Sequence, residues 1–413
     1  MRIDINKCRI CGNQDLQKVF DLGHQYLTGR FPSNVDEVLP SGPVELVKCS
    51  GINSCGLVQL KQSYDLSEMY GDNYGYKSSL NPSMVAHLHG KVDKIMSSSF
   101  LTNGDLIIDI GSNDATTLNR FPVGEFILLG VDPSAGKFEN CYRSDVSLIK
   151  DFFSRKIIVD KIGPTLKAKL ISSYSMFYDL EAPLNFMREI EDSLDNDGIW
   201  IFEQSYLPKM IDTNSFDTIC HEHLEFYTLK QIVWMAEKAN LKIVDVEFND
   251  VNGGSFIVTA AKFNSNIQVQ ASKIVSILEE EVAKGYDSVH LWENFTNRVN
   301  QNKKNFLSFL IEAKKNGSRV CGIGGSTKGN VLLQYYGIGP DLIECIGEVN
   351  KDKFGCFTPG SKIPMLPEKE VLESNPDYLV IFPWHFKKFF LSSEKFKNRK
   401  LVFPLPNFEI IIT

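Results

Sequence analysis

The sequence predicts an α/β protein in which a small cysteine-rich domain precedes two larger domains, each built on a doubly wound parallel sheet. Four of the nine cysteines lie within the first 55 residues, and two later segments each combine a short apolar strand, a glycine turn and a second strand. The predicted domains are residues 1–70, 71–263 and 264–413. This division of 413 residues agrees with an average of about 150 residues per domain.

The composition excludes some classes of protein. Hydrophobic residues make up 43% and charged residues 23% of the chain, as in ordinary globular proteins. A net charge of −7 argues against a nucleic-acid partner, which needs a basic face. The first residues lack the apolar segment of a signal peptide, and no run of about 18 apolar residues is present. We therefore expect a cytoplasmic protein without a membrane partner, either a monomer or a weak homodimer.

The N-terminal cysteines form two pairs, Cys8 with Cys11 and Cys49 with Cys55, and a glycine follows two of them in tight-turn fashion. In a reducing compartment such clustering favours a metal over a disulfide. Four thiolates suit tetrahedral zinc, and a closed site of this kind leaves no position open for a substrate. We therefore expect a structural zinc that stabilises the small domain; four unrelated buried thiols are the alternative.

Residues 65–81 contain three tyrosines and show no periodicity. This composition is typical of an ordered loop, although a surface linker fits it equally well. A helix is expected to begin at Pro82, because proline suits the first helical position. The second domain would follow from there.

The second domain begins with a strand at residues 105–110, a Gly-Ser-Asn-Asp-Ala turn, a helix, and a second strand that ends before Asp132. In a doubly wound sheet this order places a ligand at the carboxyl ends of the strands, and Asp132 can accept from both hydroxyls of a ribose. The turn has one glycine and an acid, so it suits a cationic tail better than a pyrophosphate. We therefore expect S-adenosylmethionine rather than a dinucleotide; an unliganded turn with Asp132 as a helix cap is the alternative. The candidate donor-binding residues are Asp109, Gly111, Ser112, Asn113 and Asp132.

Two more strands of this sheet are expected, one in residues 168–179 and one in residues 198–206, with a covering helix at 184–194. The second strand ends in an acid and in the amide of Gln204. Because polar groups at strand ends contact the ligands of such sheets, Gln204 is a candidate substrate contact.

Two of the seven histidines lie in the run Cys220-His221-Glu222-His223. An imidazole, with an unperturbed pKa of about 6.5, serves as a base near neutrality or as a metal ligand. In an extended segment His221 and His223 would face the same side, as metal ligands do, but no third ligand is evident except Glu222. We therefore expect a catalytic base; a metal centre and structural histidines are the alternatives.

The last third begins with two amphipathic helices between residues 266 and 316. A strand, a glycine turn and a helix start follow at residues 319–330, with later strands at 342–349 and 377–382. The turn lacks Gly-x-Gly-x-x-Gly, so NAD is not expected. Helix amides together with Lys328 suit a phosphate, and glycines that serve packing alone are the alternative.

Seven motifs occur in order along the chain, and together they identify a resemblance to the S-adenosylmethionine-dependent C-methyltransferases of nucleotide-linked 4-keto-6-deoxy sugars. The resemblance covers essentially the whole chain. It implies an N-terminal zinc-binding domain, a central class I methyltransferase domain with a Rossmann-like fold, and a C-terminal Rossmann-like domain that binds the nucleotide sugar. The motifs are Cys8-Arg-Ile-Cys-Gly, Cys55-Gly-Leu-Val-Gln-Leu, Asn73-Tyr-Gly-Tyr-Lys-Ser-Ser, Asp109-Ile-Gly-Ser-Asn-Asp, Phe216-Asp-Thr-Ile-Cys-His-Glu-His, Gly253-Gly-Ser and Thr327-Lys-Gly-Asn.

The resemblance also implies a mechanism. A ketone at sugar C4 makes the C3 hydrogen removable, a base takes it, and the enolate carbon attacks the sulfonium methyl group. The base of the family corresponds to His223, with Glu222 as an assisting carboxylate and Tyr76 as an active-site tyrosine. The candidate catalytic set is therefore His223, Glu222, Tyr76 and His221, and the candidate substrate contacts are Tyr74, Ser78, Gln204, Lys328 and Asn330.

Two positions depart from the family pattern, which has tyrosine in place of Cys220 and histidine in place of Asn252. A thiol is a weak hydrogen-bond donor and cannot replace a phenol at a sugar oxyanion, so another residue does that work or the substrate differs. Three other functions remain open: methylation of oxygen or nitrogen, a zinc-ribbon interaction protein without catalysis, and a metal-dependent hydrolase centred on the histidines.

Overall fold

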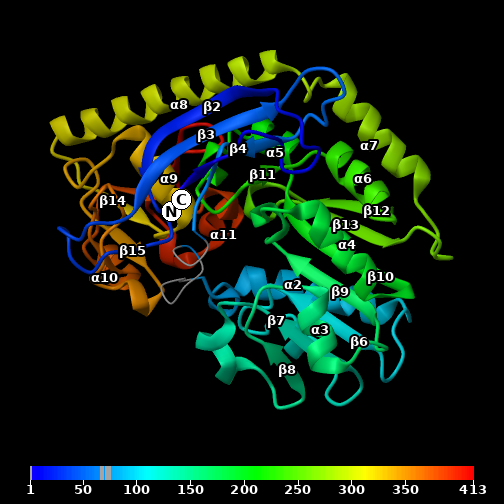
Figure 1. Cartoon of the computed structure of the whole chain (residues 1–413). Coiled ribbons are helices and arrows are strands. Elements are labelled where there is room, and N and C mark those ends of the chain that lie inside the picture. The colour runs from blue at the N-terminus through cyan, green and yellow to red at the C-terminus, as the bar shows by residue number, and fades with distance from the viewer. Residues whose placement is uncertain (1, 66–68, 70–75) are drawn as a thin grey trace.

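The computed structural model describes residues 2–65, 69 and 76–413 of the chain. The N-terminal part contains an antiparallel sheet that includes one strand from far along the chain, directly after the histidine run (Figure 1). Its strands in spatial order are β11 (Glu225–Phe226), β4 (Val58–Leu60), β3 (Ser41–Cys49) and β2 (Leu16–Tyr26), and a separate pair joins β1 (Ile3–Asp4) to β5 (Gln62–Ser63).

The central sheet has the spatial order β12-β13-β10-β9-β6-β7-β8, and its strands from β10 to β8 are parallel. From β6 the chain winds outward in one direction through β7 and β8, and it then returns to wind the other way through β9 and β10. The switch point therefore lies between β6 and β9, where such sheets bind ligands at their carboxyl ends. The strands are β6 (Leu106–Ile110), β7 (Ile127–Val131), β8 (Val146–Ile149), β9 (Ala168–Tyr174), β10 (Leu194–Ser205), β12 (Leu241–Asn249) and β13 (Ser255–Lys262).

Both faces of this sheet are buried. Side chains alternate along β6, so that Ile108 belongs to one hydrophobic cluster and Ile107 to the cluster on the opposite face. Helix α2, which begins at the predicted Pro82 with Asn81 as its cap, covers the second face. The helices are α2 (Pro82–Ser97), α3 (Arg155–Ile162), α4 (Pro183–Ser193), α5 (Leu207–Asp212), α6 (Leu229–Lys238) and α7 (Ala271–Ala283).

The C-terminal sheet has the order β16-β15-β14-β17-β18-β19, parallel except for β19. Its switch point lies between β14 and β17, at the start of α9. The elements are β14 (Val320–Ile323), β15 (Ile346–Glu348), β16 (Met365–Pro367), β17 (Tyr378–Ile381), β18 (Lys400–Phe403), β19 (Glu409–Ile412), α8 (Val289–Lys315), α9 (Thr327–Tyr336), α10 (Glu368–Glu373) and α11 (Lys387–Ser392). Figure 1 shows α8 running along the N-terminal strands.

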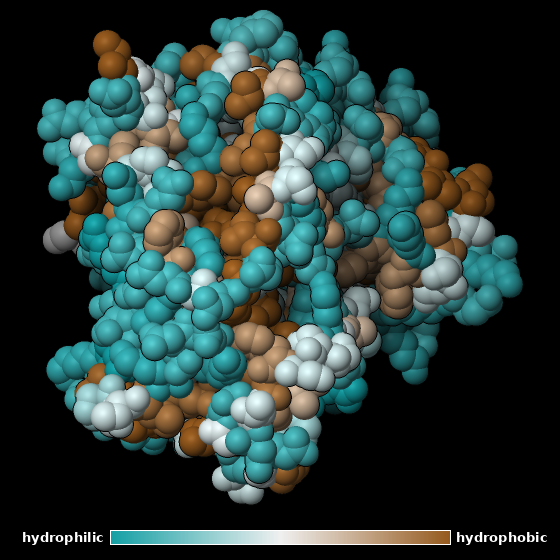
Figure 2. Space-filling view, turned by 90° about the vertical axis from the view of Figure 1, so that its right-hand side faces the viewer, coloured by the Kyte–Doolittle hydropathy of each residue, from teal (hydrophilic) through white to brown (hydrophobic). Residues whose placement is uncertain are grey.

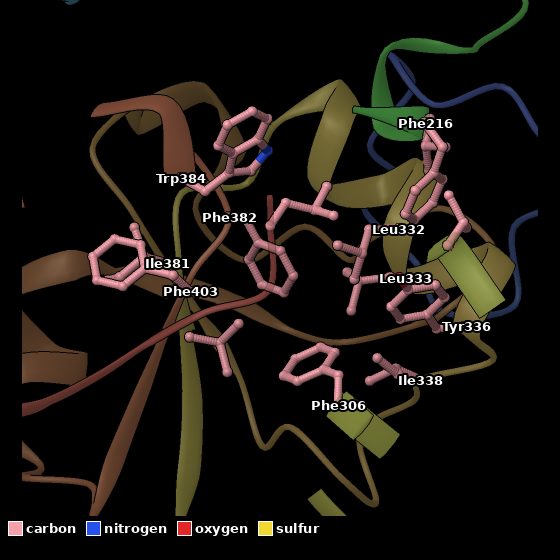
Figure 3. Packing of buried hydrophobic residues seen from close by; sticks show 14 of the residues in the cluster. Phe216, Phe306, Leu332, Leu333, Tyr336, Ile338, Ile381, Phe382, Trp384 and Phe403 are labelled. Carbon is pink, nitrogen blue, oxygen red and sulfur yellow. The ribbon is translucent and has the colours of Figure 1, made fainter. Parts of the chain in front are cut away.

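The histidine run is anchored in the core of the C-terminal domain. Phe216, which lies five residues before the first histidine, is fully buried, and its ring centroid is 5.3 Å from that of Tyr336 on α9. Figure 3 shows Phe216 and Tyr336 in one cluster with Phe306 and Phe382. The same cluster continues into β2, β3 and β4. The run is therefore fixed between the N-terminal and C-terminal sheets.

The predicted fold class is confirmed, with one local correction. A helix was expected directly after Gly111, but the segment forms only a short 3-10 helix over Leu118–Arg120. Asn113 and Ala115 both have a positive φ, of 48° and 61°, which a regular α-helix does not tolerate. The strand expected at 342–349 is also shorter, because β15 begins only at Ile346.

No described helix is long and apolar enough to cross a bilayer. Figure 2 shows mostly hydrophilic side chains on one face of the molecule, with a band of apolar ones down its middle. Apolar atoms contribute more than half of the accessible surface of ordinary proteins, so this band alone has no functional meaning.

Candidate active site

The four predicted metal ligands lie together in the N-terminal domain. Sγ of Cys8 is 3.5 Å from Sγ of Cys55, Sγ of Cys11 is 3.5 Å from Sγ of Cys49, and all four atoms lie within 4.8 Å of one another. Zinc bound at about 2.3 Å would hold four thiolates about 3.8 Å apart, so the donor set and its spacing fit zinc. Among the described residues no other group of three or more candidate ligands exists, so the histidine run lacks the partners of a metal centre.

The zinc centre lies against the helix that follows the histidine run. Gly12 and Gly56 adopt φ values of 74° and 75°, which let the chain turn tightly after Cys11 and Cys55. The carbonyl oxygen of Cys55 accepts from Nε2 of Gln231 at 3.0 Å, and Gln231 completes the capping box of α6. The metal site and this helix are therefore directly connected.

The five predicted donor-binding residues meet at the carboxyl ends of β6 and β7. Gly111 has φ 73°, and a Cβ at this position would lie 3.2 Å from Cγ of Met176. Asp109 accepts from Oγ of Ser172 at 2.6 Å, and the backbone amide of Asn113 donates to Asp132 at 2.9 Å. Oγ of Ser112 lies 2.8 Å from the hydroxyl of Tyr142.

The chemistry of this loop fits S-adenosylmethionine. Burial raises the pKa of Asp109 to about 7, and the charge of Asp132 adds to the rise, so the site is rich in acid and favours a cationic ligand. Nearby at the ends of β9 and β10, the Tyr174 hydroxyl and both amide atoms of Gln204 are buried, and they have no hydrogen-bond partner among the described residues. A bound ligand would satisfy these atoms.

Several polar residues around this loop were missed in the sequence. Ser172 donates to Asp109, and the Tyr142 hydroxyl is hydrogen-bonded to Ser112. Glu203 precedes Gln204, and its two carboxylate oxygens lie 2.8 and 2.9 Å from Nε2 of His87 on α2. Asn249 adds a third contact to the same carboxylate at 3.0 Å. Position at a strand end was the available signal for Glu203, whereas nothing local indicates a partner as distant in sequence as His87.

His223 has the geometry of a base. Its Nδ1 lies 2.6 Å from the carbonyl oxygen of Thr218. Because a carbonyl can only accept, Nδ1 carries the hydrogen and Nε2 keeps a free lone pair. Burial lowers the pKa of His223 to about 4, and the Lys328 charge contributes, so the ring is neutral at pH 7. Within the part of the chain that the structure describes, Nε2 has no hydrogen-bond partner.

His221 and Glu222 have different neighbours from His223, because the run forms a turn rather than an extended segment. The His221 ring is fully buried edge-on to Tyr64, with the centroids 4.6 Å apart, whereas the His223 ring packs against Tyr178 at 4.5 Å. Glu222 borders the N-terminal domain, where a Cβ on Gly29 would lie 3.0 Å from Oε1. The carbonyl of Thr218, and not Glu222, therefore orients the His223 ring.

Several buried polar atoms lie in the histidine segment, in α9 and in the segment after β17. Among the described residues, no hydrogen-bond partner exists for Oγ1 of Thr218, Oε2 of Glu222, Oδ1 of Asn330 and Nδ1 of His385. Trp384, at the edge of the cluster in Figure 3, donates from Nε1 to the buried carboxylate of Asp217 at 2.8 Å.

The predicted substrate contacts near residue 76 are hydrogen-bonded to the donor loop, which is the Gly111-Ser-Asn-Asp-Ala turn after β6. Nδ2 of Asn113 donates to the carbonyl oxygen of Tyr76 at 3.2 Å, and Oδ1 accepts from the backbone amide of Ser78 at 3.0 Å. Tyr76 as a whole residue is 46% exposed, whereas burial raises the pKa of its hydroxyl group. The predicted contact Tyr74 lies outside the described residues.

Lys328 points toward the central domain. Its Nζ donates to the carbonyl oxygen of Asn252. Asn330 lies two residues further along α9, and its Nδ2 donates to the carbonyl oxygen of Thr28 at 2.7 Å. At the start of α9, the amide of Gly325 is bound by the carboxylate of Glu348 at 3.0 Å. The phosphate role of Lys328 therefore stays a prediction.

Comparisons with known proteins cover nearly the whole chain. Three family models match in order: "Putative zinc binding domain" over residues 8–70, "Methyltransferase domain" over residues 90–246, and "C-methyltransferase C-terminal domain" over residues 250–406. The C-methyltransferase NovU of Streptomyces niveus is 26% identical over 412 residues, which cover 98% of this chain and 97% of that protein.

Two solved structures show weaker likeness. A S-adenosylmethionine-dependent methyltransferase from Clostridium acetobutylicum is 12% identical with a TM-score of 0.34, over 43% of this chain and 91% of that one. The magnesium protoporphyrin IX methyltransferase from Synechocystis is 13% identical with a TM-score of 0.32, over 44% and 81%. Likeness at this level carries no argument.

The matched domain models and the cysteine cluster confirm the predictions of S-adenosylmethionine and zinc as cofactors. The residue roles within the donor loop and around His223 stay predictions. The three domains in order and the full-length relative establish that the chain belongs to the S-adenosylmethionine-dependent C-methyltransferases with an N-terminal zinc-binding domain and a C-terminal C-methyltransferase domain.

Proposed function

We propose that the enzyme methylates a nucleotide-linked 4-keto-6-deoxy sugar at C3, the carbon next to the ketone. The observation that carries this proposal is the orientation of His223: Nδ1 lies 2.6 Å from the carbonyl oxygen of Thr218, and Nε2 has no hydrogen-bond partner within the described residues. The resemblance noted in the sequence supports the sugar class, and the orientation of the histidine supports the carbon chemistry.

A carbon needs a base before it can be methylated, whereas an oxygen or nitrogen already has a lone pair. His223 is neutral at pH 7, and its Nδ1 hydrogen bond to Thr218 directs the basic Nε2 away from that carbonyl. The proton moves from the carbon to Nε2, and the electron pair of that bond moves toward the ketone oxygen. S-adenosylmethionine supplies the electrophilic methyl group when it is bound.

The buried polar atoms of these three segments support a substrate rich in hydroxyl groups. A buried polar atom without a partner costs about 1–3 kcal/mol, so each of the four that lack a partner among the described residues requires an explanation. They include acceptors and donors from both the central and the C-terminal domains, namely Thr218 Oγ1, Glu222 Oε2, Asn330 Oδ1 and His385 Nδ1. A sugar offers hydroxyls that both donate and accept, and it can satisfy each of these atoms.

Tyr76 and Ser78 are proposed to contact the sugar from the donor side, because both are joined to the loop at Asn113. Gln204 lies at the end of β10, and its buried amide group has no hydrogen-bond partner among the described residues, so it is proposed to contact the donor or the sugar at the switch point. His221 is proposed to support the run through Tyr64 rather than to touch the substrate.

The experiment offers the enzyme S-adenosylmethionine together with 4-keto-6-deoxyhexoses linked in turn to thymidine and guanosine diphosphate. The expected product is one methylene heavier, and in deuterated water deuterium enters beside the ketone. His223→Gln should abolish both reactions, whereas the matched control His290→Gln, at an exposed position on α8, should leave them unchanged. Undiminished exchange in His223→Gln would sink the assignment of the base.

A further inference from the structure

The side chain of Lys328 reaches from α9 to the carbonyl oxygen of Asn252 in the central domain. We propose that its ammonium group stabilises the negative oxygen of the enolate that forms when His223 removes the proton. This inference rests on the proposed function and assigns the residue that performs the work for which Cys220 is unsuited.

The ammonium group of Lys328 is held by the central domain. Nζ of Lys328 donates to the carbonyl oxygen of Asn252, and Nδ2 of Asn252 lies 3.3 Å from Oγ of Ser175. Ser175 follows β9, and its backbone amide donates to the carbonyl oxygen of Glu203 at 2.7 Å. Lys328 is therefore tied to the carboxyl ends of β9 and β10, on the side where the donor binds.

The start of α9 is already occupied by groups of the protein itself. The amide of Gly325 binds Oε2 of Glu348 at 3.0 Å, and Oγ of Ser326 accepts from the amide of Gly329 at 3.1 Å. Nζ of Lys353 donates to the carbonyl oxygen of Gly325 at 2.8 Å. A carboxylate at this position repels a phosphate, so the helix start is a poor site for a phosphate beside Lys328.

Lys328 and His223 lie on segments that pack together. Helix α9, whose second residue is Lys328, contacts the 3-10 helix Phe216–Thr218, and the carbonyl oxygen of Thr218 orients His223. Asp217 of the same 3-10 helix is 1% exposed and accepts from Trp384. Burial lowers the pKa of His223, and the charge of Lys328 adds to the fall. Burial also lowers the pKa of Lys328, and the charge of Asp217 opposes that fall. A cation and the base thus share one buried region.

Cys220 is unsuited to stabilise a negative oxygen. It is buried beside Glu222, and burial raises the pKa of its thiol well above the ordinary value, so it stays a neutral and weak donor. When the carbon–hydrogen bond breaks, the proton goes to Nε2 of His223 and the electron pair creates a negative charge on the former ketone oxygen. The ammonium group of Lys328 balances that charge without giving up a proton.

The test replaces Lys328 by methionine, which is close in length and carries no charge, and by arginine, which restores the charge. Lys314→Met, at an exposed position on α8, is the matched control. Deuterium exchange beside the ketone, kcat, inhibition by thymidine and guanosine diphosphate, and calorimetric binding of S-adenosylmethionine are measured on the zinc-loaded enzyme. Retained donor binding shows that a variant is folded.

We expect Lys328→Met to slow both exchange and methyl transfer by about 100- to 1,000-fold, as loss of an oxyanion-stabilising group does in other enzymes. Nucleotide inhibition and donor binding stay unchanged, and Lys328→Arg recovers part of the rate. If instead nucleotide inhibition weakens while exchange stays at the wild-type rate, Lys328 binds phosphate and the proposal is wrong. Wild-type enzyme that exchanges no keto sugar at all would overturn the proposed function, and this inference with it.

Discussion

Removal of the zinc centre should lower kcat although zinc takes no part in the reaction, because the N-terminal sheet supports the segment that contains His223, the proposed base. β4 of the zinc domain pairs with β11, which begins two residues after His223. The backbone amide of Leu60 also donates to the carbonyl oxygen of Leu224 at 2.8 Å. Substitution of Cys11 by serine removes one of the four sulfurs and disturbs this support.

The size of the effect follows from the contacts that connect the two regions. They are the Leu60–Leu224 hydrogen bond, which belongs to the pairing of β4 with β11, and the Gln231–Cys55 hydrogen bond of 3.0 Å. At about 0.5–1.5 kcal/mol for each net hydrogen bond, their loss amounts to about 1–3 kcal/mol. The population with a correctly placed His223 should then fall by about 5- to 150-fold, and kcat with it.

Donor binding should survive this change, because the loop at Gly111 belongs to the central sheet. The assay compares zinc content, kcat and calorimetric binding of S-adenosylmethionine in Cys11→Ser and in Cys356→Ser, a cysteine of the C-terminal domain outside the cluster. The wild type and the control should hold one zinc ion per chain. A Cys11→Ser enzyme without zinc but with the full wild-type kcat would refute the reasoning.

Three further predictions concern the donor loop and the two histidines. Gly111→Ala forces alanine to φ 73°, so calorimetry should show donor binding weakened by about 5- to 30-fold, or 1–2 kcal/mol. The control Gly104→Ala is also strained, at φ 90°, but its Cβ lies in open space, and donor binding should be unchanged. The kcat/KM of the wild type should be level at neutral pH with an acid limb near pH 4; a limb near pH 6.5 would contradict the buried base. Burial lowers the pKa of His221 to about 4, so the unfolded chain binds a proton that the folded one excludes, and stability falls as pH drops from about 6.5 toward 4. Between pH 7.5 and 5 the wild type should lose about 2 kcal/mol more than His221→Gln in urea unfolding, and parallel curves would exclude this contribution.

Local patterns predicted much of the molecule because each depends on residues close in sequence. Gly111 is needed where the backbone turns to a positive φ after β6, and Asn81 with Pro82 specifies the start of α2. The cysteine spacing predicted a cluster because thiolates with a common metal need matching turns. These features were predictable because few alternatives satisfy their local chemistry.

Other features depend on contacts between distant segments, which a single sequence does not reveal. The addition of β11 to the N-terminal sheet and the contact of His87 with Glu203 are of this kind. The histidine run was expected to face one side as an extended segment, but the anchoring of Phe216 in the C-terminal core leaves it in a turn. The carboxylate of Glu348 likewise occupies the start of α9, where helix amides together with Lys328 suggested a phosphate.

The central claim is that a carbon activated by His223 receives the methyl group. The most direct measurement is nuclear magnetic resonance of the product formed in deuterated water from S-adenosylmethionine labelled with ¹³C in its methyl group. We expect the label on a ring carbon next to the ketone, and no labelled product from His223→Gln. A label attached to oxygen or nitrogen, or transfer by His223→Gln at the wild-type rate, would contradict the account.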